Sequence, residues 1–90
     1  MSTKNVEELN PAQCRAGRAL LEITQTQLAS SAGLGLSTVV DFEKERRHVS
    51  PESVEAIRRA LVQAGVEFIE ENGGGAGARL RKRQRPKQPK

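Results

Sequence analysis

The chain has 90 residues, 36% of them hydrophobic and 2% aromatic, so it can form one small domain with a mainly aliphatic core. One cysteine excludes an internal disulfide, and no apolar segment indicates a signal peptide or a membrane span. The charge is uneven: residues 1–78 carry a formal charge of −3, whereas residues 79–90 hold seven basic residues and no acid. We therefore expect a soluble intracellular protein with a mildly acidic domain and a basic tail.

The first predicted helix follows a polar segment, residues 1–9, that is expected to be flexible. Asn10 suits the N-cap and Pro11 suits the first helical position. The helix is expected to run to about Glu22. Its inward stripe consists of small and apolar residues: Cys14, Gly17, Leu20, Leu21 and Ile23. Cys14 is interpreted as a core residue, because neither a second cysteine nor a histidine cluster accompanies it.

Two short helices are predicted in the centre of the chain. Thr24 and Gln27 have the spacing of a capping box, and Gly33 suits the position after a helix end. The apolar face of the first of these helices is formed by Leu28, Ala29 and Ala32. After the turn Gly33-Leu34-Gly35, the inward residues are expected to be Val39, Phe42 and Leu36. Two short helices joined by a glycine-containing turn form a helix-turn-helix unit.

A charged turn, residues 44–48, separates this unit from a fourth predicted helix. His48 is interpreted as a loop residue and not as a ligand or base. Ser50 suits the N-cap of the fourth helix, Pro51 its first position, and Glu52 the positive end of its dipole. The apolar residues that recur at helical spacing are Val54, Ile57, Leu61 and Ala64. Gly65 is expected to end the helix.

Two short strands are predicted after the helices, at residues 66–69 and 78–81, with a glycine-rich turn between them. They pair either within one chain or between two chains, and the sequence leaves both alternatives open. Residues 82–90 are polar, basic and proline-containing, so we expect disorder there. The expected organisation is therefore a flexible N-terminus (1–9), a helical domain (10–65), a β extension (66–81) and a basic tail (82–90).

The pattern Q-x-x-L-A-x-x-A-G-L-x-x-S-T-V-x-x-F-E, read from Gln25 to Glu43, resembles the lambda-repressor/Cro-like (xenobiotic-response-element, XRE) regulators. The resemblance covers roughly residues 11–65. It implies an all-α fold, a bundle of four helices around a helix-turn-helix, here followed by the β extension and the tail. It also implies that Arg18 pairs with Glu43. Glu45 stands where many relatives have glycine, and a left-handed residue other than glycine costs about 1 kcal/mol, unless the turn is built differently.

The resemblance implies a sequence-specific DNA-binding transcriptional regulator that inserts the helix Leu36–Lys44 into the major groove. The residues expected to face base edges are Leu36, Ser37, Thr38, Val40 and Asp41. Those expected near the phosphate backbone are Gln25, Lys44, Arg46 and Arg47, and Gln27 is also expected among the DNA-binding residues. Leu36 and Val40 suit thymine methyls, and Asp41 suits cytosine, but no Arg, Lys, Asn or Gln lies between Leu36 and Glu43. The alternative is therefore an antitoxin-like or adaptor module with weak or no base reading.

The expected partners are double-stranded DNA, which the basic tail would attract, and a second copy of the chain. A lone hairpin is marginal in water, so dimerisation is expected through Val66, Phe68, Ile69 and Leu80. The alternative is a monomer in which Phe68 and Ile69 fold onto their own helices. No catalytic, cofactor, metal or small-molecule motif is evident, and no membrane contact is expected. The expected location is the cytoplasm, in association with the bacterial nucleoid.

Overall fold

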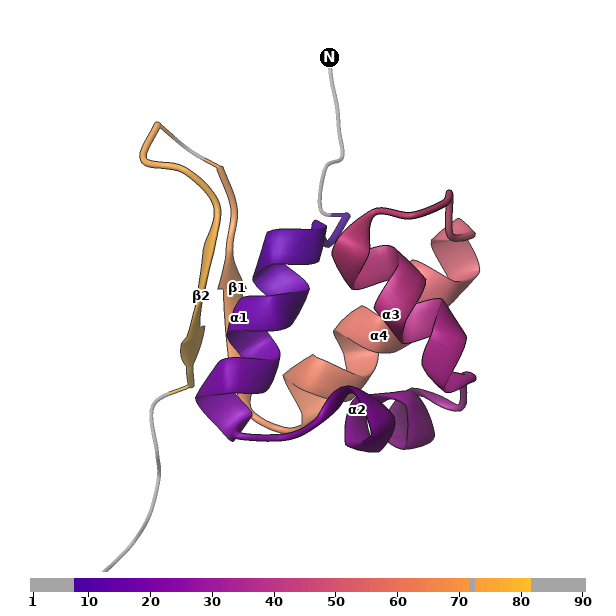
Figure 1. The fold of residues 1–90 in the computed structure, drawn as a ribbon. Coiled ribbons are helices and arrows are strands. Elements are labelled where there is room, and N and C mark those ends of the chain that lie inside the picture. Colours follow the sequence, from indigo (N-terminus) through magenta and orange to yellow (C-terminus); the bar gives the residue numbers. More distant parts are fainter. Residues whose placement is uncertain (1–7, 72, 82–90) are drawn as a thin grey trace, which may run out of the picture.

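Four helices and one antiparallel hairpin form the fold in the computed structural model, which describes residues 8–71 and 73–81 (Figure 1). In chain order the elements are α1 (Pro11–Leu21), α2 (Gln25–Ala32), α3 (Leu36–Lys44), α4 (Pro51–Gln63), β1 (Val66–Ile69) and β2 (Gly77–Leu80). The predicted four-helix, helix-turn-helix fold with a short β extension is confirmed. Residues 1–7 of the expected flexible N-terminus and the expected disordered tail, 82–90, lie outside the described residues.

The helices begin where their capping residues predict. The side chain of Asn10 accepts a hydrogen bond from the Gln13 amide at 2.7 Å, and the Gln13 side chain accepts one from the Asn10 amide at 3.1 Å. Thr24 and Gln27 form the same reciprocal capping box at the start of α2. The hydroxyl of Ser50 caps α4. Each cap satisfies amide groups that have no partner inside the helix, and so fixes the helix start.

Three helices end at a left-handed residue. Gly33 ends α2 with φ of 72°, as its lack of a side chain predicts. Glu22 ends α1 with φ of 59°, and Glu45 ends α3 with φ of 55°. The chain therefore keeps at residue 45 the backbone conformation that glycine would adopt more easily, and it carries a strain of about 1 kcal/mol there.

The core lies where the four helices meet. The structure corrects the interpretation of Leu9, Leu20, Leu36 and Ala64, and it adds Val49, which was left unassigned. Ala64, assigned to the apolar stripe of α4, is exposed. Leu9, assigned to the flexible N-terminus, is only 4% exposed, and Val49 of the turn before α4 is also buried. Leu20 and Leu36, assigned to inward faces, are 37% and 45% exposed. The other core side chains come from the predicted stripes, with Val66 added from β1: Cys14, Leu28, Ala29, Val39, Phe42, Val54, Ile57, Leu61 and Val66.

The hairpin lies beside α1, and its two strands pair within one chain (Figure 1). Val66 pairs with Leu80 and Ile69 pairs with Gly77. Gln13 of α1 binds the end of the hairpin next to its turn. Its Nε2 donates to the carbonyls of Ile69, at the end of β1, and Gly77, at the start of β2, at 3.3 and 3.1 Å. Pairing of β1 with β2 thus forms the hairpin, and the side-chain amide of Gln13 attaches it to the helical domain.

The expected dimerisation residues are used partly inside the chain. Val66 is fully buried in the core of its own chain, and Phe68 is half-buried against that core. The apolar edge that a second copy was expected to cover is therefore covered by the chain's own helices at these two positions. Leu80 differs, because it remains 43% exposed. Dimerisation itself stays a prediction, and Leu80 is now its best-placed residue.

Candidate nucleic-acid interface

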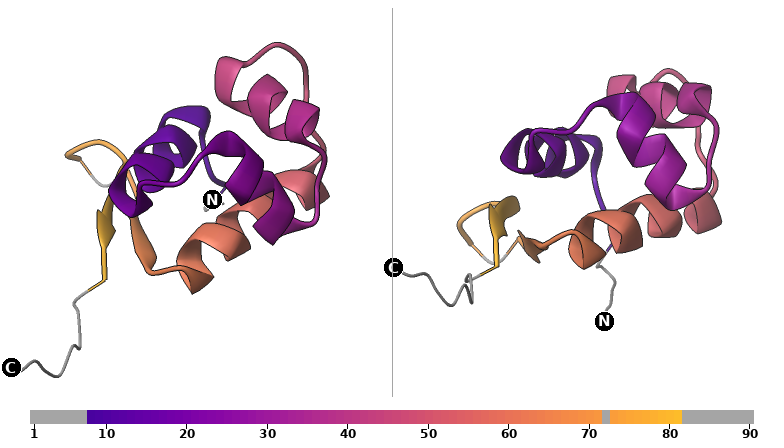
Figure 2. Two further views of the ribbon diagram at one scale, coloured as in Figure 1. Left: turned by 60° about the horizontal axis from the view of Figure 1, so that its bottom comes forward. Right: turned by 90° about the horizontal axis from the view of Figure 1, so that it is seen from below.

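Helices α2 and α3 form the helix-turn-helix unit, and α2 lies between α3 and α4 (Figure 2). Leu28 and Ala29 bury the inner side of α2, and the Leu34 amide donates to the Ala29 carbonyl at 2.9 Å in the turn. This hydrogen bond therefore holds the turn against the last turn of α2. Because Gly35 supplies no side-chain cap, the first turn of α3 leaves its backbone amides free of side-chain hydrogen bonds.

A buried carboxylate holds α3 in place. Glu43 is 2% exposed, and its two oxygens accept from Arg18: Nε reaches Oε2 at 2.7 Å and Nη2 reaches Oε1 at 2.8 Å. The thiol of Cys14 donates to Oε2 at 3.1 Å, and Nε2 of Gln25 donates to Oε1 at 2.9 Å. Arg15 adds a hydrogen bond to the Glu43 carbonyl. One side chain of α3 is therefore tied to both α1 and α2, and the predicted Arg18–Glu43 pair is confirmed.

Burial and hydrogen bonds together set the protonation of the Glu43, Arg18 and Cys14 side chains. Desolvation alone would raise the pKa of Glu43, but the bonds from Arg18, Cys14 and Gln25 outweigh it and leave the pKa below its usual range. The bond to Glu43 raises the pKa of Arg18. Burial, and then the bond to Glu43, raise the pKa of Cys14, so the thiol stays protonated as a donor. Cys14 is thus a core residue, as interpreted, with an added structural hydrogen bond.

The outward side of α3 is open in its first turn. Leu36 and Ser37 are exposed, whereas Thr38 and Val40 are half-buried. The opposite side of the helix, formed by Val39, Phe42 and Glu43, is buried. The five residues predicted to face base edges therefore divide into two exposed residues at the helix start and three partly buried ones behind them, Thr38, Val40 and Asp41.

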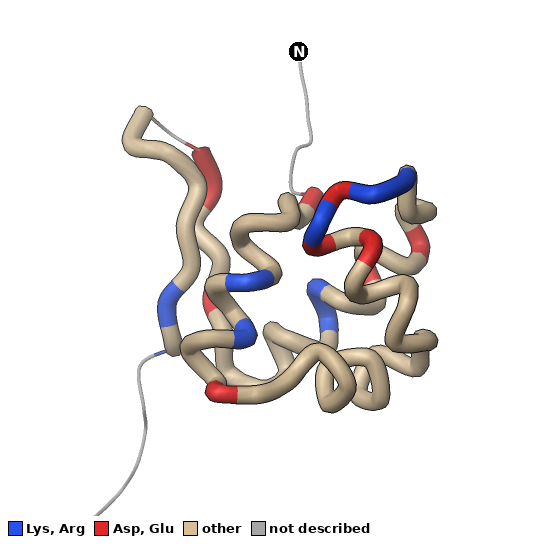
Figure 3. Tube along the Cα trace, in the orientation of Figure 1, with Lys and Arg blue, Asp and Glu red and all other residues tan. Residues whose placement is uncertain are grey.

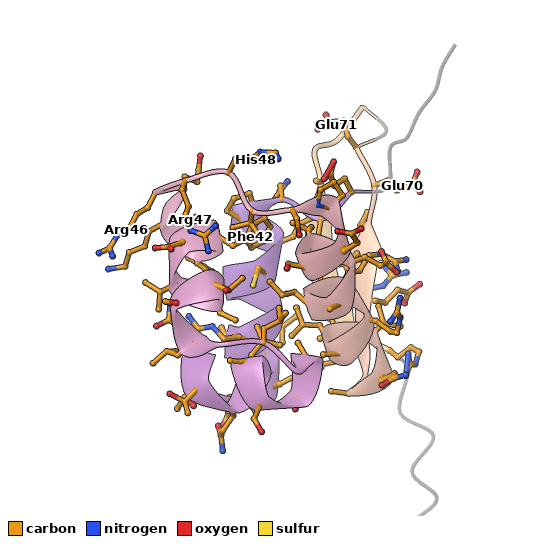
Figure 4. The ribbon with its side chains drawn as sticks, turned by 90° about the vertical axis from the view of Figure 1, so that its right-hand side faces the viewer. Phe42, Arg46, Arg47, His48, Glu70 and Glu71 are labelled. Carbon is orange, nitrogen blue, oxygen red and sulfur yellow. The ribbon has the colours of Figure 1, made fainter. Side chains whose placement is uncertain are left out.

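The turn after α3 is mostly basic (Figure 3). Arg46 and Arg47 project outward there (Figure 4), with side chains 59% and 52% exposed. Nε of Arg47 lies 2.8 Å from Oδ2 of Asp41, and Nη1 of Arg46 lies 3.9 Å from Oδ1. Asp41, predicted to accept from cytosine, is thus an ion-pair partner of the predicted phosphate contacts. Lys44 is exposed on the last turn of α3.

The two glutamines expected to bind DNA already have partners in the structure. Gln25 is half-buried, and its amide nitrogen is the donor to Glu43 described above. The side-chain oxygen of Gln27 accepts from the Thr24 amide at 2.8 Å in the capping box. The sequence pattern signalled the capping role of Gln27. It gave no signal for the bond between Gln25 and Glu43, which lie 18 residues apart.

The acidic end of the molecule lies away from the basic turn. Glu70 and Glu71 follow β1 on the side of the hairpin, whereas Arg46 and Arg47 lie at the end of α3 (Figure 4). A cavity of about 220 Å³ opens beside these acids, and Glu8, Arg58 and Phe68 also line it. Across residues 8–71 and 73–81, no group of three or more His, Cys, Asp or Glu side chains is placed to hold a metal ion. The exposed side chains of Arg46 and Arg47 therefore lie at the end of α3, away from the acids beside the cavity.

Comparison with known proteins agrees with this geometry. The family model HTH_3, described as Helix-turn-helix, matches residues 15–61, which include α2, the turn and α3. No curated protein matches the chain in sequence. None of the helices in the described part of the chain has the length and apolar character needed to cross a membrane. The matched segment covers more than half of the chain, which therefore belongs to the Cro/C1-type helix-turn-helix (XRE) family, a family of DNA-binding, non-enzymatic domains.

Proposed function

We propose that the chain is a sequence-specific transcriptional regulator that inserts α3 into the major groove of DNA. The observation that carries this proposal is the combination of a free outer surface and a fixed position in one helix. Leu36 and Ser37 are exposed at the start of α3, while Glu43 ties its last turn to α1 and α2. Base reading requires a helix whose first residues are accessible and whose orientation does not vary.

The base contacts would be few and largely apolar. Leu36 and Val40 suit thymine methyl groups, and the Ser37 hydroxyl suits either a base edge or a phosphate. Thr38 is half-buried next to them and would contribute at most at the edge of this surface. Such a set predicts a preference for sites with thymines at the positions facing α3, with modest discrimination at each base pair.

Backbone contacts would supply most of the affinity. The exposed side chains of Lys44, Arg46 and Arg47 lie at the end of α3, where the DNA backbone passes when the helix start is in the groove. Gln25, at the start of α2, would contribute through the helix N-terminus and the free part of its amide. The basic tail would add salt-sensitive attraction that the mildly acidic domain lacks.

The regulator is proposed to act as a symmetric dimer through the outer edge of β2, which pairs with no strand among residues 8–71 and 73–81. The Arg81 amide donates to the Gly65 carbonyl at 2.7 Å, so residues 77, 79 and 81 direct their backbone groups toward β1. The backbone groups of Ala78 and Leu80 therefore point to the other side. Pairing of this edge with a second copy would satisfy them, cover Leu80 and space two α3 helices for two half-sites.

An interaction module remains the second candidate. The segment from Leu36 to Glu43 contains none of the side chains that most often read guanine or adenine, which favours a fold that has lost base reading. Selection of bound duplexes from a random-sequence library by the purified chain separates the two. Recovery of a common motif with two-fold symmetry supports the regulator. Recovery of unrelated sequences, with equal affinity for all of them, would instead support the module.

A further inference from the structure

Asp41 is an acid at a surface proposed to meet a polyanion, and its contacts show what it does there. Its Oδ2 accepts from Nε of Arg47 at 2.8 Å, and its Oδ1 lies 3.9 Å from Nη1 of Arg46. The Asp41 side chain is only 19% exposed, although both arginines are more than half exposed. The carboxylate is therefore less exposed than its two basic partners, and both arginines of the turn after α3 share it.

The backbone of the turn creates this arrangement. With Glu45 left-handed, the Glu45 amide bonds the Phe42 carbonyl at 3.2 Å and the Arg46 amide bonds the Asp41 carbonyl at 2.9 Å. These two bonds form a Schellman-type helix end, which folds the following residues back over the last turn of the helix. Nη1 of Arg47 also donates to the His48 carbonyl at 3.3 Å. The guanidinium of Arg47 therefore donates both to the Asp41 carboxylate and to the His48 carbonyl of its own turn.

An aspartate carboxylate and a DNA phosphate compete for the same donors, because both offer paired anionic oxygens to a planar guanidinium. We propose that Asp41 is an intramolecular substitute for a DNA phosphate, which occupies Arg47 and attracts Arg46 in the free protein and so restrains their binding to the DNA backbone. The inference rests on the proposed function and assigns Asp41 a positioning role that needs no contact with a base.

The restraint acts on the phosphate part of the binding free energy. For Arg47 to present the Nε edge of its guanidinium to a phosphate, its bond to Asp41 must open, and the carboxylate then loses this partner near a polyanion. Binding to non-matching DNA depends almost entirely on phosphate contacts. Asp41 therefore lowers the affinity of the basic turn for DNA of non-matching sequence.

The variant Asp41→Asn tests this directly. It keeps the size of the side chain and removes an acid from the negative end of α3, so the fold should be retained. The probe is a non-matching duplex of about 25 base pairs, long enough for two half-sites one helical turn apart. Freeing one or two arginines should steepen the slope of log affinity against log salt by about 0.9 to 1.8. Lowering the salt from about 200 to about 50 mM should therefore gain roughly 3- to 10-fold more affinity in the variant than in the parent.

Glu55→Gln is the matched control. Glu55 lies on α4 and also has two arginine partners, with Arg58 and Arg59 both 3.6 Å away. This variant makes the same change in charge away from α3, so its slope should stay at the parent value. A further comparison places Asp41→Asn in the background R46Q/R47Q, where the increase in slope should disappear because no restrained arginine remains to be freed.

Three results would overturn the proposal: an unchanged or weaker affinity of Asp41→Asn, an equal gain in Glu55→Gln, or a full gain in the R46Q/R47Q background. An equal gain in Glu55→Gln would mean that the effect comes from net charge. A full gain in the R46Q/R47Q background would mean that it comes from repulsion between Asp41 and the DNA. The parent protein separates this failure from failure of the proposed function. If the parent binds duplex DNA and Asp41→Asn changes nothing, the restraint alone is wrong. If the parent binds no duplex, the DNA-binding function is wrong.

Discussion

Arg18 of α1 and Glu43 of α3 form a two-bonded ion pair, Nε to Oε2 at 2.7 Å and Nη2 to Oε1 at 2.8 Å, in the contact between the two helices. The Glu43 side chain is 1% exposed and the Arg18 side chain 21% exposed, so the carboxylate is the buried member. Such pairs contribute less to stability than their geometry suggests, because desolvation offsets the attraction. Their main effect here is to fix the orientation of α3 relative to the rest of the domain.

Glu43→Gln should destabilise the fold strongly. The amide cannot neutralise Arg18 or accept from Arg18, Cys14 and Gln25 together, and the loss of one member of a buried pair costs about 3–5 kcal/mol. The pKa of Glu43 is lowered in the fold, so its stabilising effect is present above the unfolded value, about pH 4.3, and is lost as the pH falls through the folded value. Urea titrations of both proteins at neutral and strongly acidic pH check this. A stability difference that does not shrink in acid would contradict it.

Glu45→Gly should stabilise the domain. Residue 45 has φ of 55°, a conformation that glycine adopts without the steric cost paid by glutamate. We expect a gain of about 0.5–1 kcal/mol, which raises the melting temperature by roughly 2–8 °C in a domain of this size. Thermal denaturation followed by circular dichroism measures it. The control Glu55→Gly, inside α4, should instead destabilise by about 1 kcal/mol, and a loss of stability in both variants would refute the strain at residue 45.

The helical part of the fold was predictable because its signals are local. The caps at Asn10, Thr24 and Ser50 and the apolar spacing within α2 and α4 lie within a few residues of one another. The arginine–glutamate pair was predictable through the family pattern. Leu9 and Val49 were not, since each lies outside a helix and is buried only by segments distant in the sequence.

The finer structure of the candidate site depended on contacts that no local pattern carries. The pairing of Asp41 with Arg47 requires the left-handed end of α3, and the strand attachment requires Gln13 to reach residues 56 and 64 positions away. The sequence left two alternatives for the strands because each is compatible with alternating side chains. Their pairing within the chain became clear only with the register of β1 and β2.

Removal of the tail should weaken DNA binding without changing its sequence preference. Deletion of residues 82–90 removes five positive charges. Each charge that reaches a phosphate contributes about 0.9 to the slope of log affinity against log salt, so the slope should fall by that amount per lost contact. Fluorescence anisotropy over a salt series measures it. An unaltered slope would mean that the tail makes no phosphate contact, and alanine at the two tail prolines provides a control that keeps every charge.

Leu80→Asp should convert a dimer into a monomer while preserving the helices. Leu80 is 43% exposed, so a charge there need not damage the core, whereas Phe68 packs near Gly17 and Leu61 and is less suitable for the test. Light scattering at concentrations far above an assumed dissociation constant of about 1 µM should report a dimer for the parent and a monomer for the variant. Gln63→Asp, at the end of α4, is the surface control. A monomeric parent, both free and on DNA, would contradict dimerisation.

The affinity of α3 variants for the selected site and for a scrambled duplex tests the central claim most directly. Ser37→Ala and Val40→Glu alter the outer side of α3, and Gln63→Glu adds the same charge as Val40→Glu on α4. Loss of a base contact costs about 1–3 kcal/mol, so the first two variants should lose roughly 5- to 150-fold affinity for the selected site. For the scrambled duplex, the affinity of Ser37→Ala should stay at the parent value, and that of Val40→Glu should fall by a smaller factor than its affinity for the selected site. Parent-like binding of the selected site by both α3 variants would show that this helix does not read the bases.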